Sequence, residues 1–97
     1  MTKQETLDRL TKHGPEIRRR FAVKTLAVFG SLARGEADAG SDVDVLVAFE
    51  GRADFDGFMD LKFYLEELLG VRVDLVTDHA LRPRLRPAIE REAIHVA

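Results

Sequence analysis

Two aspartates separated by one residue, Asp42 and Asp44, have the clearest potential for chemistry in this sequence. They alternate with Val43 and Val45, which is typical of a β-strand, where side chains i and i+2 project from the same face. Two carboxylates side by side on an apolar strand repel each other and are poorly solvated. A divalent cation relieves this repulsion, and Mg²⁺ prefers a few carboxylates together with phosphate oxygens of a substrate. The pair therefore predicts a magnesium site.

A second group of residues, shortly before the aspartates, is suited to bind an anion. The apolar run 26–29 ends at Gly30, which has no Cβ and lets the backbone approach a ligand closely. Ser31 adds a hydroxyl and a backbone N–H at the start of a turn, where amides favour anions. Arg34 follows one helical turn later and can bind the same anion with two N–H groups. An anion site beside a carboxylate metal site is what phosphoryl or nucleotidyl transfer needs.

Three strands must position these groups. For the Gly-Ser turn at the end of the first strand to meet the aspartates at the start of the second, these two strands must be antiparallel. A strand–helix–strand connection, which normally joins parallel strands with right-handed sense, leads to the third strand. Asp74 then lies level with Asp42 and Asp44, so that three carboxylates converge on one end of a mixed sheet. The expected strands are residues 23–29, 42–49 and 71–77.

Helices are expected at both ends of the chain. Thr2 and Glu5 form a capping-box pattern, so the first helix begins at the terminus. The pair Gly14-Pro15 interrupts it, because the proline ring clashes with the preceding turn, and predicts a kink or two short helices. The last helix is expected to begin near Pro83 or Pro87, since proline is tolerated in a first turn.

The middle helix, from Asp54 or Asp56 to Leu69, carries two apolar stripes. One stripe, which includes Leu61 and Leu65, is enough to cover a small sheet. The second stripe comprises Phe55, Met59 and Phe63. It is either further core or, in a domain this small, an exposed surface for a partner.

The composition indicates one small globular domain over residues 1–97, with 45% apolar and 33% charged residues. The absence of cysteine excludes disulfides and thiolate zinc sites and favours an intracellular, cytoplasmic setting. No apolar run approaches the length of a membrane span. The net charge of −2 argues against direct binding of nucleic acid.

The complete pattern resembles a known family. Gly30-Ser31, ten intervening residues and Asp42-x-Asp44, with Arg34-Gly35 inside the gap, are similar to the signature of the minimal nucleotidyltransferases, the smallest members of the DNA polymerase β-like superfamily. The resemblance covers nearly the whole chain. It implies an α/β (α+β) nucleotidyltransferase fold, in which helices pack on a small mixed sheet of three to four strands.

The resemblance also implies roles for individual residues. Asp42, Asp44 and Asp74 would be the catalytic residues and the ligands of two Mg²⁺ ions, or of Mn²⁺, roughly 4 Å apart. Asp74 would take the proton of an acceptor hydroxyl. The residues expected to bind the nucleoside triphosphate, with ATP as the substrate, are Gly30, Ser31, Arg34 and Ser41.

In this family the acceptor is typically a HEPN-domain toxin, and the minimal nucleotidyltransferase is the antitoxin that attaches AMP to a tyrosine of the toxin. The resemblance therefore implies Mg²⁺-dependent transfer of AMP from ATP to a hydroxyl of a partner protein, within a hetero-oligomer or a homo-oligomer. A catalytically silent antitoxin that acts by stoichiometric binding remains the alternative. A small-molecule adenylyltransferase of the aminoglycoside type is less favoured, because the sequence contains no acceptor domain.

Overall fold

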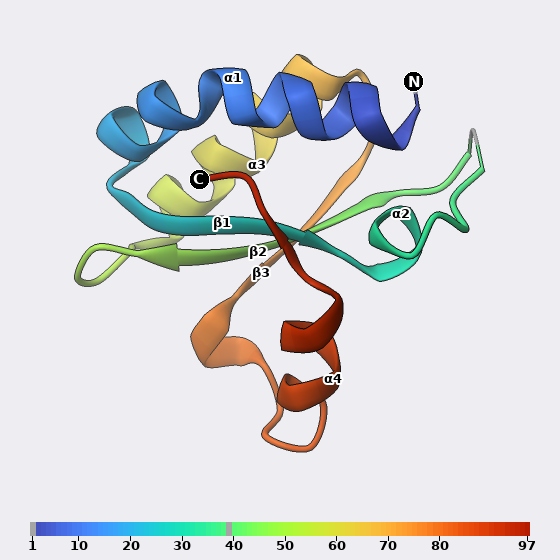
Figure 1. Ribbon diagram of the computed structural model, residues 1–97. Coiled ribbons are helices and arrows are strands. Elements are labelled where there is room, and N and C mark those ends of the chain that lie inside the picture. Colours follow the sequence, from blue (N-terminus) through green and yellow to red (C-terminus); the bar gives the residue numbers. More distant parts are fainter. Residues whose placement is uncertain (1, 39) are drawn as a thin grey trace.

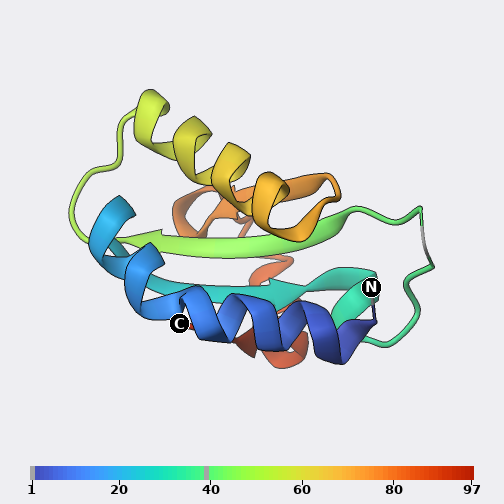
Figure 2. The ribbon, with the colours of Figure 1, turned by 90° about the horizontal axis from the view of Figure 1, so that it is seen from above.

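The computed structural model describes residues 2–38 and 40–97. Within these residues four strands form one mixed sheet in the order β3-β2-β1-β4. The two long helices, α1 and α3, lie next to each other on one face of the sheet, and α4 lies on the other side (Figures 1 and 2). The elements are α1 Lys3–Phe21, β1 Val23–Phe29, α2 Gly30–Ala33, β2 Val43–Phe49, α3 Phe55–Leu69, β3 Val73–Thr77, the 3-10 turn η1 Asp78–Ala80, α4 Arg86–Glu92 and β4 Ile94–His95.

The strand arrangement confirms the topology expected from the sequence. β1 and β2 are antiparallel, with Phe29 opposite Asp44, so the end of β1 lies beside the start of β2. β2 and β3 are parallel, with Asp44 opposite Asp74. β2 and β3 begin one and two residues later than expected. The fourth strand, β4, extends the sheet next to β1, where Ile94 pairs with Val28.

The core lies between the sheet and the two long helices. Fully buried aliphatic side chains from both helices meet valines and leucines of the strands, which is the arrangement expected when one apolar stripe of each helix covers a sheet. The largest buried apolar side chains are Leu10 and Ile17 of α1, Leu26 and Val28 of β1, Val45 and Val47 of β2, and Leu61 and Leu65 of α3.

The first helix differs from one of the two expectations. The predicted capping box is present, with the Glu5 N–H donating to Thr2 Oγ1 at 3.1 Å and the Thr2 N–H donating to Glu5 Oε1 at 3.2 Å. However, α1 runs without interruption through Pro15, so the prediction of two short helices is wrong, while the alternative of a kink within one helix stays a prediction. Leu10 and Ile17, on either side of the proline, are both fully buried, and this packing holds both turns against the sheet.

The second apolar stripe of α3 is largely exposed. The side chains of Phe55 and Phe63 are 74% and 57% exposed, so they are not part of the core, and Met59 is half-buried. The helix itself begins and ends as expected, after the N-cap Asp54 and before Gly70, which adopts the left-handed conformation. In the described part of the chain, no helix combines the length and apolar character of a membrane span.

Candidate active site

The three aspartates predicted from the sequence meet at one end of the sheet. Asp42 directly precedes β2, Asp44 is the second residue of β2, and Asp74 is the residue of β3 that pairs with Asp44. Asp42 and Asp74 are exposed and Asp44 is half-buried. The parallel pairing of β2 and β3 therefore brings carboxylates from two separate segments together at the surface.

The carboxylates are close enough to influence one another's ionisation. The pKa of Asp44 is raised above its ordinary value, first by partial burial and then by the charges of Asp74 and Asp42, while the charge of Arg34 acts in the opposite direction. Within residues 2–38 and 40–97, none of the three aspartates forms an ion pair with a lysine, arginine or histidine. A concentration of negative charge that no ion pair within the described residues neutralises favours binding of a metal ion.

The donor set fits Mg²⁺ that completes its coordination with substrate. Among the described residues, no three His, Cys, Asp or Glu side chains form a compact metal-binding cluster. Mg²⁺ does not need such a cluster, because it usually binds through one or two carboxylates, waters and phosphate oxygens. Asp42 and Asp44 would provide the carboxylates for such an ion, and their position at the surface leaves room for substrate oxygens.

Gly30 brings the Gly-Ser turn into contact with Asp44. Gly30 is buried, and its φ of +74° is one that side-chain-bearing residues rarely adopt. A Cβ at this position would overlap the Oδ2 atom of Asp44 and lie 2.9 Å from its Cγ. The position therefore requires glycine for two reasons: its backbone conformation and the close approach of the Asp44 side chain.

Arg34 is adjacent to this turn but binds carboxylates of the protein itself. Its Nε donates to Glu36 Oε1 at 2.7 Å and its NH1 group to Glu92 Oε2 at 2.9 Å. The other carboxylate oxygen of Glu92 accepts the Gly30 N–H at 3.0 Å. The Arg34 guanidinium and the Gly30 N–H hold the pKa of Glu92 below its ordinary value.

Sequence reasoning did not identify Glu92. It lies in α4, 62 residues from Gly30, among charged residues whose spacing does not distinguish it. The role of Glu92 can be recognised only from the folded structure, in which the pairing of β4 with β1 places the end of α4 beside β1.

The two serines differ in their surroundings. Ser31 is the second residue of α2, next to the Gly30 amide, and its carbonyl accepts the Glu36 N–H at 2.8 Å. The Ser41 hydroxyl instead donates to Asp38 Oδ1 at 3.1 Å and accepts the Asp38 N–H, also at 3.1 Å. The structure thus places Ser31 at the turn, while Ser41 closes the loop before β2. Binding of the nucleotide by either serine stays a prediction.

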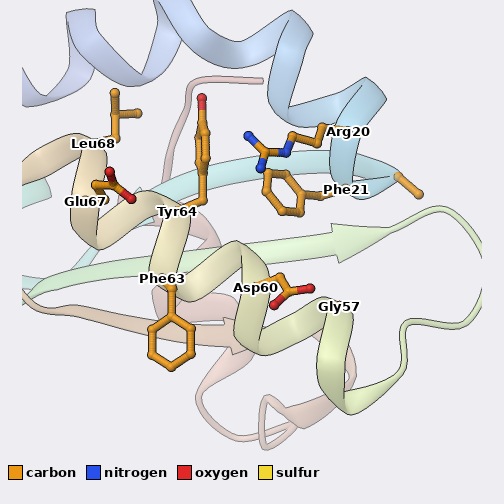
Figure 3. A pocket seen from close by; sticks show the side chains of 9 residues that line it. Arg20, Phe21, Gly57, Asp60, Phe63, Tyr64, Glu67 and Leu68 are labelled. Carbon is orange, nitrogen blue, oxygen red and sulfur yellow. The ribbon is translucent and has the colours of Figure 1, made fainter.

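A larger hollow lies away from the aspartates. It has a volume of about 1000 Å³ and is located between the end of α1 and α3, where the rings of Phe21 and Tyr64 pack against each other and the Arg20 guanidinium lies over both (Figure 3). Ala22, which also lines this hollow, directly precedes β1, whereas the aspartates lie beside the other end of β1. The hollow is therefore separate from the predicted metal and phosphate site.

Comparisons with known proteins identify the family of this chain. A family model described as "Nucleotidyltransferase domain" matches residues 10–96. The chain is 45% identical to "Protein adenylyltransferase MntA" of Thermococcus cleftensis, over 99% of this chain and 97% of the relative. A solved structure described as "putative minimal nucleotidyltransferase" is 46% identical, with a TM-score of 0.84, over 97% of this chain and 95% of the other.

A more distant structure shares the fold alone. It is that of a tri-AMPylated HEPN toxin of Shewanella oneidensis in complex with an MNT antitoxin, with a TM-score of 0.68 and 17% identity over 94% of this chain and 71% of the other. The matches of the family model and of the relatives span nearly the whole chain. This protein therefore belongs to the nucleotidyltransferase-domain family, as a minimal nucleotidyltransferase homologous to protein adenylyltransferase MntA.

Proposed function

We propose that this protein is a Mg²⁺-dependent adenylyltransferase that transfers AMP from ATP to a hydroxyl of a partner protein. The observation that carries the proposal is the convergence of Asp42, Asp44 and Asp74 beside the tightly packed turn at Gly30. Such a site combines metal-binding carboxylates with backbone and side-chain donors for phosphate, which are the parts that nucleotidyl transfer requires.

The residues divide the work by position. Asp42 and Asp44 would hold Mg²⁺, which would neutralise charge on the phosphates and lower the pKa of the acceptor hydroxyl. The turn at Gly30 and the guanidinium of Arg34 bind the triphosphate. Asp74 accepts the proton of the acceptor hydroxyl, whose oxygen forms a bond to the α-phosphorus as the bond to pyrophosphate breaks.

We further propose that the acceptor is a HEPN-type toxin and that the two proteins form a hetero-oligomer. The support comes from relatives: a homologue 45% identical is named a protein adenylyltransferase, and a structure of the same fold contains an AMPylated HEPN toxin with an MNT antitoxin. Transfer of AMP to the toxin would make this protein its antitoxin.

The test compares Asp42→Asn with the parent protein. Each protein is incubated with ATP, Mg²⁺ and the HEPN-domain protein whose gene lies nearest to that of the adenylyltransferase. The mass of the HEPN-domain protein is then measured by mass spectrometry. The substitution keeps the shape of the side chain but removes one charge from the metal site, so transfer should fall by at least about 100-fold. Asp8→Asn, which makes the same change on the exposed face of α1, is the matched control and should transfer AMP normally.

Binding is measured in the same samples by pull-down. Asp42 is not part of the hydrophobic core, so the variant should still capture the partner. An unmodified partner that is nevertheless neutralised equally by the parent and by Asp42→Asn would overturn the catalytic proposal. It would instead identify a silent antitoxin that acts by binding.

A further inference from the structure

The carboxylate of Glu92 binds the two hydrogen-bond donors that are predicted to bind phosphate, the Gly30 N–H and the Arg34 guanidinium. Glu92 accepts the Gly30 N–H with Oε1 and binds the Arg34 guanidinium with Oε2, at 3.0 and 2.9 Å. A phosphate group, with several peripheral oxygens, would use the same two donors in the same way. The Gly30 N–H and the NH1 group of Arg34 cannot serve Glu92 and a nucleotide fully at the same time.

We propose that Glu92 is an internal competitor of the nucleotide, and that its carboxylate must leave Gly30 and Arg34 before the triphosphate can bind there. This inference rests on the proposed function, because it takes these two residues as phosphate-binding groups. It adds a residue that sets the affinity for the nucleotide and a contact that keeps the site closed to polyphosphate in the free protein.

The backbone around Glu92 keeps the carboxylate near the turn. Two residues further on, β4 pairs with β1, and the Val96 N–H donates to the Leu26 carbonyl at 2.9 Å. The side chain is thus tethered, and its effective concentration at the site is high. Displacement needs only a change of side-chain rotamer, because the hydrogen bonds that fix the following strand are made by the backbone.

The contact is weak enough to be broken by a substrate. The Arg34 side chain is 47% exposed and that of Glu92 is 23% exposed, so water screens the pair. A triphosphate carries more charge than one carboxylate, and it also gains contacts with the metal site. The apparent affinity equals the intrinsic affinity multiplied by the fraction of molecules whose site is open. Glu92 therefore weakens nucleotide binding without preventing it.

The test measures binding of MgATP, and of inorganic tripolyphosphate with Mg²⁺, by isothermal titration calorimetry. Glu92→Gln removes the charge while keeping an acceptor for the Gly30 N–H, and it should tighten both ligands by about three- to ten-fold. Glu90→Gln is the matched control, since it removes the same charge from the same helix. Glu90 pairs with Arg86 at 3.4 Å and not with Gly30 or Arg34. The affinity of Glu90→Gln for both ligands should therefore match that of the parent.

Glu92→Ala provides a second variant, and thermal melting checks that each variant is folded. If Glu92 only orients Arg34 for the substrate, both Glu92 variants will bind tripolyphosphate more weakly than the parent, and the proposed competition is overturned. Equal affinities in the parent and both variants overturn it as well, while the proposed function stands. If neither the parent nor the variants bind either ligand, both proposals fail.

Discussion

At the scale of single residues, the charge of Asp44, which suits the proposed metal site, lowers the stability of the metal-free protein. Its ionisation is opposed by partial burial and by the charges of Asp74 and Asp42. Because its pKa is raised on folding, the folded state holds the proton to a higher pH than the unfolded chain. The destabilising contribution is therefore absent below the ordinary value of 3.8, grows as pH rises through the folded-state pKa, and is complete above it.

Replacing Asp44 by Asn should stabilise the metal-free protein. The amide has nearly the same shape but no charge, so at neutral pH the free energy of unfolding should rise modestly, because water screens this partly exposed group, and the gain should disappear below about pH 4. Urea unfolding in EDTA at several pH values measures the difference. Asp8→Asn, whose carboxylate lies outside this cluster, should show no such gain. A loss of stability in Asp44→Asn at neutral pH would mean that the three carboxylates do not repel one another.

Gly30 and Gly35 provide a matched pair for separating backbone strain from contact with the site. Both have positive φ, +74° and +75°, but a Cβ at Gly35 meets nothing within 4 Å, whereas at Gly30 it overlaps Asp44. Gly35→Ala should cost about 1–2 kcal/mol of stability and leave MgATP binding intact. Gly30→Ala should cost about 2–5 kcal/mol and abolish binding, because the carboxylate of Asp44 must move.

Urea unfolding and calorimetric titration with MgATP distinguish these outcomes. If Gly30→Ala loses no more stability than Gly35→Ala and still binds MgATP, the close approach of Gly30 to Asp44 has no role in the site.

At the scale of elements, α1 contains two adjacent residues that are poor helix formers for different reasons. A Cβ on Gly14 would lie 3.0 Å from the Val96 carbonyl oxygen and 3.4 Å from Ala97 Cβ, so this glycine allows the end of the chain to pack on the helix. Pro15 is exposed and removes one backbone hydrogen bond from the helix. The same pair that predicted a break thus includes one residue with a packing role.

Alanine substitutions of these two residues should therefore have opposite effects. Pro15→Ala restores a backbone donor in an exposed turn and should stabilise the protein by about 1–2 kcal/mol. Gly14→Ala has a favourable helix propensity of about 1 kcal/mol, but it pushes against the backbone of Val96 and should be destabilising overall. Thermal unfolding of the two variants measures both signs. A stabilising Gly14→Ala would show that the tail moves away without cost.

The sequence predicted those elements whose signals are local or periodic. The strands followed from the alternation of apolar and polar residues, and the end of α3 followed from Gly70. The pairing of Asp44 with Asp74 followed from the parallel strands that a strand–helix–strand connection predicts. The uninterrupted α1 did not, because tertiary packing of Leu10 and Ile17 outweighs the local effect of Pro15. The pairing of β4 and the contact of Glu92 with Gly30 depend on neighbours distant in sequence, which spacing alone does not reveal.

At the scale of the whole molecule, the groups of the proposed active site come from three separate segments between residues 30 and 74. Gly30 and Arg34 lie at α2, Asp42 and Asp44 at β2, and Asp74 in β3. These segments are held together only by the folded sheet, since the unfolded chain brings no two of them close in a fixed geometry. A ligand that needs all of them binds the folded state alone and must raise its stability.

Melting curves with Mg²⁺ and a non-hydrolysable ATP analogue should show this linkage. At a ligand concentration of about ten times Kd the stabilisation is about 1.4 kcal/mol, which for a domain of this size raises Tm by about 5–10 °C. The rise should require Mg²⁺ and analogue together, because the carboxylates and the phosphates each supply only part of the metal's ligands. Asp74→Asn should reduce the rise, whereas Asp8→Asn should reproduce that of the parent. An equal shift for the parent and Asp74→Asn, with or without Mg²⁺, would place nucleotide binding away from the three aspartates.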